Sequence, residues 1–260
     1  MDNAARPITL MTYNVKNPDP ARNWPARVPV LLDIVRRNDP DLLCVQEAFD
    51  HQMDDLRQGL PDYTAIGQGR EGGTAGEHAA VFFRTSRFRP DEDGSFWLSD
   101  TPDEPASNTW GSVYPRIANH VRFLDVEGPT FTLLTTHLDH EPNAHGDEVR
   151  GRSAALIVER LAGTGGPVVV AGDCNEPAGT GSASRVFAEA GYTDAWTVAG
   201  DPDDRTATYN DWEPPVDSGE RIDWVLTKDV AGVDRVRIDH DGPETWFASD
   251  HFPVIATLRM

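Results

Sequence analysis

The sequence has little cysteine and little positive charge, and it has no long apolar run. Cys44 and Cys174 are its two cysteines, which excludes a disulfide framework and a cysteine-rich zinc site. Lys and Arg number 23 against 43 Asp and Glu, and the net charge of -20 excludes a broad basic surface for nucleic acid. A bound metal ion can make the electrostatic potential positive at its site, so the negative net charge argues only weakly against a polyanionic substrate.

No stretch of about 18 apolar residues is present, so we expect no membrane span and no membrane partner. The first ten residues lack a basic region followed by an apolar one, so we expect no signal peptide. The 260 residues, 38% of them hydrophobic, are enough for a sizeable core. These features predict a soluble, cytoplasmic protein, which we expect to be a monomer.

Short apolar runs alternate with segments of helical spacing. Several runs are apolar at successive positions, which is typical of strands buried on both faces, and the alternation predicts an α/β layered fold. Segments 91–108 and 199–220 are acidic and contain proline, which indicates surface loops, and no linker separates two cores, so we expect a single domain over residues 1–260. The predicted strands are 8–15, 42–46, 79–83, 131–136, 168–171 and 254–258, and the predicted helices lie around 28–35, 154–161 and 186–190.

Polar side chains stand where the apolar runs begin or end. Strand ends in a layered α/β fold commonly surround one crevice, so we expect these side chains to lie close together. Several buried carboxylates without matching cations are costly unless they bind a metal, and an oxygen-rich set suits Mg²⁺ or Mn²⁺. The residues are Asn14, Glu47, His137, Asp173, Asn175, Asp223, Asp250 and His251.

Each of these residues also has an ordinary structural explanation when it is taken alone. An asparagine after a strand, such as Asn14, is usually a turn residue, and the Asp-Cys-Asn of 173–175 can form an Asx turn. Glu47 can be a surface or capping residue, and His137 a hydrogen-bonded core histidine. The segment 250–251 can belong to a loop. The whole set, in this order, favours a functional site.

The motifs around these residues resemble those of the endonuclease/exonuclease/phosphatase family, from position 9 to position 258. Two further segments, FWLSDTP (96–102) and TATYNDW (206–212), are similar to a bacterial branch related to the deadenylase-like proteins. The resemblance implies a four-layer α/β sandwich, in which two packed mixed β-sheets are flanked by helices. The motifs are TYNVKN (12–17), VQE (45–47), GEHAAVFFR (76–84), PRIANHVRF (115–123), TTHLDH (135–140), AGDCNEP (171–177), RIDWVL (221–226) and SDHFPV (249–254).

The resemblance implies a metal site and a reaction centre at named positions. Glu47 matches the family's principal metal-ligand glutamate, and Asn14 and Asp250 match residues that complete or support the metal site. Asp173 matches the aspartate that orients or deprotonates the attacking water. Asn175 matches the amide donor that stabilises the pentacovalent phosphorus.

It also implies a set of phosphate contacts. His251 matches the phosphate-contacting histidine, and Asp223 matches the carboxylate that fixes its tautomer. His137 matches a second phosphate-site histidine, and Glu77 resembles its carboxylate partner in the deoxyribonuclease branch. Arg116 aligns with a phosphate-contacting arginine of that branch.

Two positions depart from the family pattern. Lys16 stands where several nucleases of the family carry a second acidic residue, so it either discourages a second metal or places a cation near the substrate. Cys174 replaces the usual phenylalanine. A packing change explains it better than a redox role does.

Three functions remain open at the level of sequence. The first is a Mg²⁺-dependent hydrolase of a small soluble phosphate ester, which the acidic composition favours. The second is a nuclease that acts on DNA or RNA. The third is a non-catalytic binding protein with the same fold, which the intact polar set disfavours.

Overall fold

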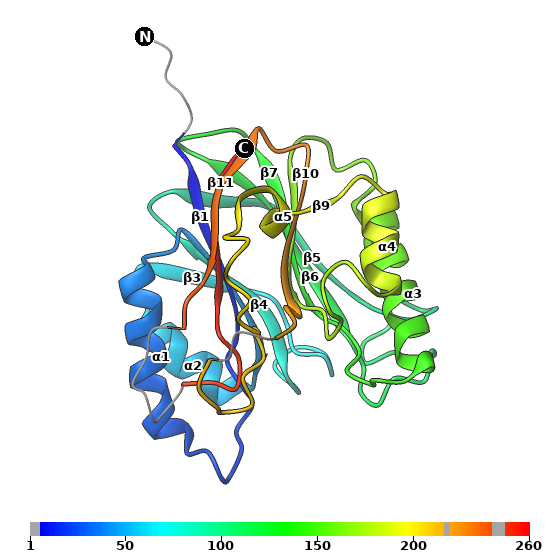
Figure 1. The fold of residues 1–260 in the computed structure, drawn as a ribbon, viewed down its shortest axis with the longest axis horizontal. Coiled ribbons are helices and arrows are strands. Elements are labelled where there is room, and N and C mark those ends of the chain that lie inside the picture. The colour runs from blue at the N-terminus through cyan, green and yellow to red at the C-terminus, as the bar shows by residue number, and fades with distance from the viewer. Residues whose placement is uncertain (1–5, 216–218, 241–247) are drawn as a thin grey trace.

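The computed structural model describes residues 6–215, 219–240 and 248–260, which form two six-stranded sheets packed face to face (Figure 1). In each sheet one pair of neighbours is parallel, β1 with β2 and β7 with β8, and the other pairs are antiparallel, so both sheets are mixed as expected. The first sheet has the order β11 (Gly232–Ile238), β12 (Val254–Arg259), β1 (Ile8–Asn14), β2 (Leu42–Ala48), β4 (His78–Arg84) and β3 (Tyr63–Ile66). The second has the order β5 (Phe88–Trp97), β6 (Ile117–Asp125), β7 (Phe131–His137), β8 (Val168–Asp173), β10 (Asp223–Lys228) and β9 (Thr193–Asp194).

Helices cover the outer faces of both sheets. The helices α1 (Trp24–Asn38) and α2 (Asp50–Gly59) lie outside the first sheet, and α3 (Ala144–Leu161) and α4 (Ser182–Glu189) lie outside the second (Figure 1). The short α5 (Ala195–Ala199) contacts β10 and β11. One apolar cluster joins the two sheets, and a separate cluster joins each sheet to its helices. The expected four-layer sandwich is confirmed. None of the helices in the described ranges is long and apolar enough to cross a membrane.

The six predicted strands and three predicted helices all form, but the prediction of a loop over 91–108 was wrong for residues 91–97. Residues 91–97 continue β5, which pairs with β6 along its whole length. Because β5 is an edge strand, its acidic middle can face solvent, and this hides the strand from a search for apolar runs. The helix α2 was not predicted, since Met53 and Leu56 are its only buried large apolar side chains.

The strand pairing brings the predicted polar residues to one end of the sandwich. In the first sheet Asn14 ends β1, opposite Gln46 of the parallel β2. In the second sheet His137 and Asp223 both lie opposite Asp173, at the ends of β7, β10 and β8. The register of strand pairing in each sheet therefore determines which polar side chains meet at this end of the sandwich.

Gly172, next to the site, lies on β8 opposite Thr136 of β7. Its φ is +154°, and a Cβ atom there would lie 2.0 Å from the backbone oxygen of Thr136. We therefore expect Gly172→Ala to lower the free energy of unfolding by about 1–3 kcal/mol, measured by urea denaturation. Gly179→Ala is the control, because its φ is +83° but a Cβ atom at that position would have no neighbour within 4 Å. Equal losses for the two variants would contradict the close approach.

Candidate active site

A cleft of about 330 Å³ opens where the two sheets end. Most of the predicted residues line it, including Glu47 and His251, which come from different ends of the sequence. The three that do not, namely Asn14, Asp173 and Asp223, are fully buried and hydrogen-bonded to residues in or around it. The structure thus brings all of the predicted site residues together. The residues of the cleft with no predicted role are Asn17, Arg70, Tyr114, His140, Tyr209 and Ile222.

The backbone around the cleft is locally strained. Glu47, Lys16 and Asn175 have φ values of 65°, 57° and 48°, in the left-handed region that non-glycine residues rarely adopt. The pairing of β2 with β4 is also irregular between Val45 and Ala48, which is a β-bulge around Glu47. A bulge re-aims the side chain that it carries, and here it turns the Glu47 carboxylate toward the cleft.

Asn14 ties the two sheets together at the base of the cleft. Its Nδ2 donates to Glu47 Oε1 and to Asp173 Oδ2, both at 2.9 Å. Its Oδ1 accepts the backbone N–H of Lys16 at 3.0 Å. Because Asn14 is fully buried, these bonds fix the relative position of a carboxylate from each sheet.

His251 lies between two carboxylates. Its Nδ1 is 2.9 Å from Asp223 Oδ2, and its Nε2 is 3.7 Å from Asp173 Oδ2. Burial alone would lower the pKa of His251, but the two negative charges and the hydrogen bond to Asp223 outweigh burial and raise it to about 10. His251 is therefore a cation at neutral pH. Its Nδ1–H donates to Asp223, and its Nε2 lies 3.5 Å from Asn14 Nδ2 and 3.7 Å from Asp173 Oδ2.

The pKa values of Asp173 and His137 are both shifted, in opposite directions and with different consequences. Burial and the neighbouring charge of Asp223 raise the pKa of Asp173 to about 7, although His251 and Asn14 oppose the shift. This value places a proton acceptor near the pH of the cell. Burial, reinforced by Arg116, lowers the pKa of His137 well below its usual value, so the imidazole is neutral although its Nε2 is 3.5 Å from Asp173.

One wall of the cleft is basic. Arg116 is buried and donates from Nη2 to Nδ1 of His140 at 2.9 Å, which leaves its Nε without a partner among the described residues. Arg70 donates to Glu77 Oε2 at 2.6 Å and lies over the ring of Tyr114. Glu77 therefore pairs with Arg70, not with His137 as the resemblance suggested, because the buried guanidinium is a stronger partner than a neutral imidazole.

Arg70 had no role in the sequence-based prediction, and its segment carries no motif that would have identified it. It follows a glycine-rich stretch, Gly67 to Gly69, that runs back beside His78 of β4 through an isolated bridge. Its contact with Glu77 is set by that loop. A pattern of residue types does not predict a contact that depends on the path of a loop. It becomes visible only in the structure, where the two side chains are 2.6 Å apart.

The chemistry of the donors suits a hard divalent cation. Glu47, His137 and Asp173 each offer a ligand atom, and these atoms lie within 4.8 Å of one another. Carboxylate oxygens with a single imidazole match Mg²⁺ or Mn²⁺ better than zinc. Asp250, predicted to complete the metal site, has its carboxylate 3.1 Å from Lys16 Nζ, which is also 3.7 Å from Glu47. The Glu47 carboxylate thus has Lys16 and Asp250 on one side and the group that could hold a metal, with His137 and Asp173, on the other.

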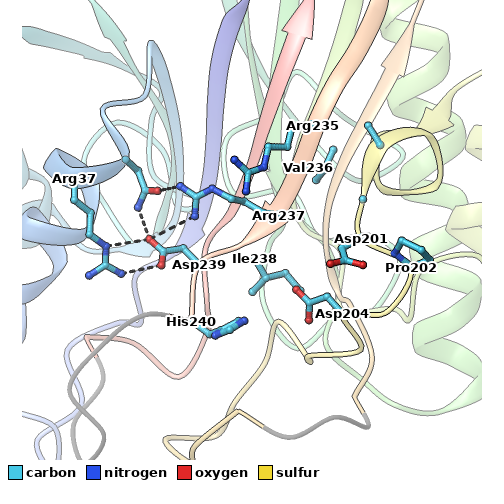
Figure 2. A pocket seen from close by; sticks show the side chains of 13 residues that line it. Arg37, Asp201, Pro202, Asp204, Arg235, Val236, Arg237, Ile238, Asp239 and His240 are labelled. Carbon is cyan, nitrogen blue, oxygen red and sulfur yellow. Dashed lines mark hydrogen bonds and ion pairs between the residues drawn. The ribbon is translucent and has the colours of Figure 1, made fainter.

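A second cavity, of about 840 Å³, is larger but carries no comparable arrangement (Figure 2). It lies between β11, the end of α1 and the loop after α5. In Figure 2 the guanidinium groups of Arg37 and Arg237 point toward Asp239, and Arg37 donates to both of its carboxylate oxygens at 2.9 and 3.2 Å. Arg37 and Arg237 both pair with Asp239, and the cavity carries no group of residues that could hold a metal among those described. The smaller cleft is therefore the candidate active site.

Comparison with known proteins agrees with the geometry. Residues 11–251 match the model of the Endonuclease/Exonuclease/phosphatase family. The chain belongs to this family. An endonuclease/exonuclease/phosphatase family protein from Bacteroides thetaiotaomicron is 31% identical, with a TM-score of 0.88 over 98% of this chain and 96% of that chain. No similar sequence was found among curated proteins.

Two other solved structures show the range of proteins with this fold. A mannosyl-6-phosphatase from Bacteroides thetaiotaomicron is 30% identical, with a TM-score of 0.88 over 97% of this chain and 100% of that chain. TDP2 from D. rerio, in complex with a single-strand DNA product, is 14% identical, with a TM-score of 0.77 over 98% of this chain and 99% of that chain, and it shares the fold alone. Members of the family are phosphoric ester hydrolases, and this chain is such a hydrolase by membership. Enzymes of the family depend on a divalent metal, and the acidic residues and the histidine of the cleft form a group that could hold one.

The second departure from the family pattern, Cys174, is explained by packing. Its side chain is buried in the cluster between the second sheet and its helices. Burial raises the pKa of the Cys174 thiol well above its usual value, which removes the thiolate that redox chemistry requires.

Proposed function

We propose that this protein is a Mg²⁺-dependent phosphoesterase that hydrolyses a small soluble phosphate ester, such as a sugar phosphate or a nucleotide. The observation that supports this most is the convergence of Glu47, Asp173 and a cationic His251 on a cleft of only about 330 Å³. The net charge of -20 also disfavours a long polyanionic substrate. A similar structure, 30% identical, is a mannosyl-6-phosphatase, which supports a phosphorylated sugar as the first substrate to test.

Each residue has a defined part in the proposed reaction. Asp173 takes the proton of the attacking water, since its raised pKa makes it a base near neutral pH. His251 donates from Nε2 to a phosphoryl oxygen and stays charged because Asp223 holds its other nitrogen. Arg116, whose Nε has no partner among the described residues, adds positive charge on the opposite wall.

Two further groups complete the proposal. Asn175 is held in the cleft by two bonds, since its backbone N–H donates to Asp173 Oδ1 at 2.9 Å and its Nδ2 donates to the oxygen of Leu138 at 3.1 Å. The remaining hydrogen of that amide is the donor proposed for the pentacovalent phosphorus. Glu47, which Asn14 holds and which shares the Lys16 ammonium with Asp250, would hold Mg²⁺ on the side that faces His137 and Asp173. When bound, the ion supplies charge withdrawal from a phosphate oxygen.

Metal removal tests this proposal directly. The protein is incubated with Mg²⁺ and a panel of hexose phosphates, nucleoside monophosphates, phosphodiesters, plasmid DNA and RNA, and phosphate release and nicking are measured. We expect phosphate release from a small ester, lost with excess EDTA and restored by Mg²⁺ or Mn²⁺. The matched control is Asp173→Asn.

The other functions predict different results in the same assay. Plasmid nicking that needs Mg²⁺ and Asp173, without release from any small ester, would replace the proposal with a nuclease. Turnover that neither EDTA nor Asp173→Asn affects would overturn the mechanism. Ester binding without turnover at any metal concentration would identify a binding protein.

A further inference from the structure

The Lys16 ammonium lies beside two carboxylates of the proposed metal site, those of Glu47 and Asp250. Its Nζ is 3.1 Å from Asp250 Oδ2 and 3.7 Å from Glu47 Oε2, and the Lys16 side chain is only 26% exposed. On its other side, the Glu47 carboxylate contacts Asn14 and belongs to the group that contains His137 and Asp173. Glu47 therefore separates two positions that favour positive charge, and a lysine already occupies one of them.

The backbone holds Lys16 in this place. Its φ of 57° turns the chain sharply after β1, and its N–H donates to Asn14 Oδ1. Its carbonyl oxygen accepts from Arg27 Nη2 at 3.0 Å and from Gln52 Nε2 at 2.9 Å, and both of these side chains are buried. Because three hydrogen bonds already fix the Lys16 backbone, only its side chain loses freedom when the ammonium pairs with the two carboxylates.

The charges of the site agree with such a role. Burial alone would raise the pKa of Glu47, but the Lys16 ammonium and the Asn14 amide lower it, so the carboxylate stays ionised. Asp250 is buried, and a buried carboxylate needs a partner of opposite charge. In the described part of the chain, Lys16 is the cation that ion-pairs with either carboxylate.

We propose that Lys16 is a built-in substitute for a second metal ion. Its ammonium neutralises the side of the site shared by Glu47 and Asp250, so the protein takes a single divalent cation on the other side of Glu47. The lysine also weakens that cation's binding, because a positive charge a few ångströms away repels it. This inference rests on the proposed metal dependence, and it decides between the two explanations that the sequence left open for Lys16.

Metal binding without turnover tests the inference. Mn²⁺ binding to the full chain is measured by isothermal titration calorimetry, and free Mn²⁺ by its electron paramagnetic resonance signal. We expect one Mn²⁺ per wild-type chain. Lys16→Met should bind Mn²⁺ about tenfold more tightly or take a second equivalent, because a repelling charge is lost and two carboxylate oxygens are freed. Lys16→Arg keeps the charge and should retain wild-type stoichiometry.

The chain has one other lysine, Lys228, which provides a matched control. Its Nζ donates to the backbone oxygen of Ala190 at 2.9 Å and lies over the ring of Tyr192, away from the cleft. Lys228→Met should therefore leave Mn²⁺ binding unchanged. With only two lysines, ¹³C-dimethylation gives one resonance for each, and Mn²⁺ should broaden that of Lys16 far more than that of Lys228.

The outcomes separate this inference from the proposed function. Two Mn²⁺ ions on the wild-type chain, or Lys16→Met with wild-type affinity and stoichiometry, would overturn the role of Lys16 and leave the proposed hydrolase intact. No Mn²⁺ binding to any variant would instead remove the metal dependence itself. Melting temperatures of the variants, measured in EDTA, show whether Lys16→Met has kept the fold.

Discussion

Asp173→Asn should lower kcat by about 10²–10⁴-fold with little change in fold. Asparagine has nearly the same shape as aspartate, but its amide cannot accept the proton of water. An amide has a single oxygen, so the new side chain at position 173 can still accept the Asn14 bond that crosses between the sheets, but its NH₂ group then faces the backbone N–H of Asn175 and that bond is lost. The measurement is steady-state phosphate release at saturating Mg²⁺ with the substrate found in the panel.

Two controls separate the chemistry from the structure in this variant. Urea denaturation should show a loss of about 1–3 kcal/mol, because the Asn175 N–H loses its acceptor, but the variant should stay folded and Mn²⁺ should still bind. Asn14→Asp would place a third carboxylate beside Glu47 and Asp173, so it should disturb metal affinity more than Asp173→Asn does. If Asp173→Asn retained activity near that of the wild type, another group would have to be the base.

Asp223→Asn should move the whole pH profile to lower pH. The Asp223 carboxylate raises the pKa of His251, so its loss lowers that pKa from about 10, and the alkaline limb of activity moves down. Burial and the same charge together raise the pKa of Asp173 to about 7, so loss of the charge also lowers the acid limb. At a fixed pH above the new alkaline limb, activity falls about tenfold for each unit by which the His251 pKa drops.

The direction of both limbs distinguishes this variant from one that is merely unstable. The profile is recorded as kcat/KM from pH 5 to pH 10.5 at constant ionic strength, with the protein's melting temperature measured across the same range. A uniform loss of activity with unmoved limbs would contradict a charge effect of Asp223. His251→Gln, which removes the titrating imidazole, should abolish the alkaline limb.

The strand ends of the site could be predicted because local sequence determines them. Asn14, His137 and Asp173 each close an apolar run, and the requirement that such runs be buried brings their ends to one edge. The edge strand β5 and the helix α2 lacked that signal, since solvent-facing acidic residues dominate both. The apolar pattern of the sequence therefore predicted the buried strands, but not the edge strand β5 or the solvent-exposed helix α2.

The details that aim the side chains could not be predicted. The bulge at Glu47 depends on pairing with β4, more than 30 residues away in sequence, and the left-handed φ of Asn175 follows no glycine signal. The pair of Arg70 with Glu77 depends on how a loop returns to β4. These features arise from contacts between distant segments, and residue types alone do not encode their geometry.

Arg27 has a consequence for how the enzyme would change in evolution or by design. It is 1% exposed, and within the described residues its side chain donates five hydrogen bonds to backbone oxygens, those of Val15, Lys16, Asn17, Arg22 and Ala248. A single guanidinium thereby joins the turn after β1 to the segment that carries Asp250 and His251. We therefore expect that neither segment can be exchanged or lengthened alone. The guanidinium also lies over the ring of Trp212, three residues after Tyr209, so altered specificity is best sought in the Arg70 loop.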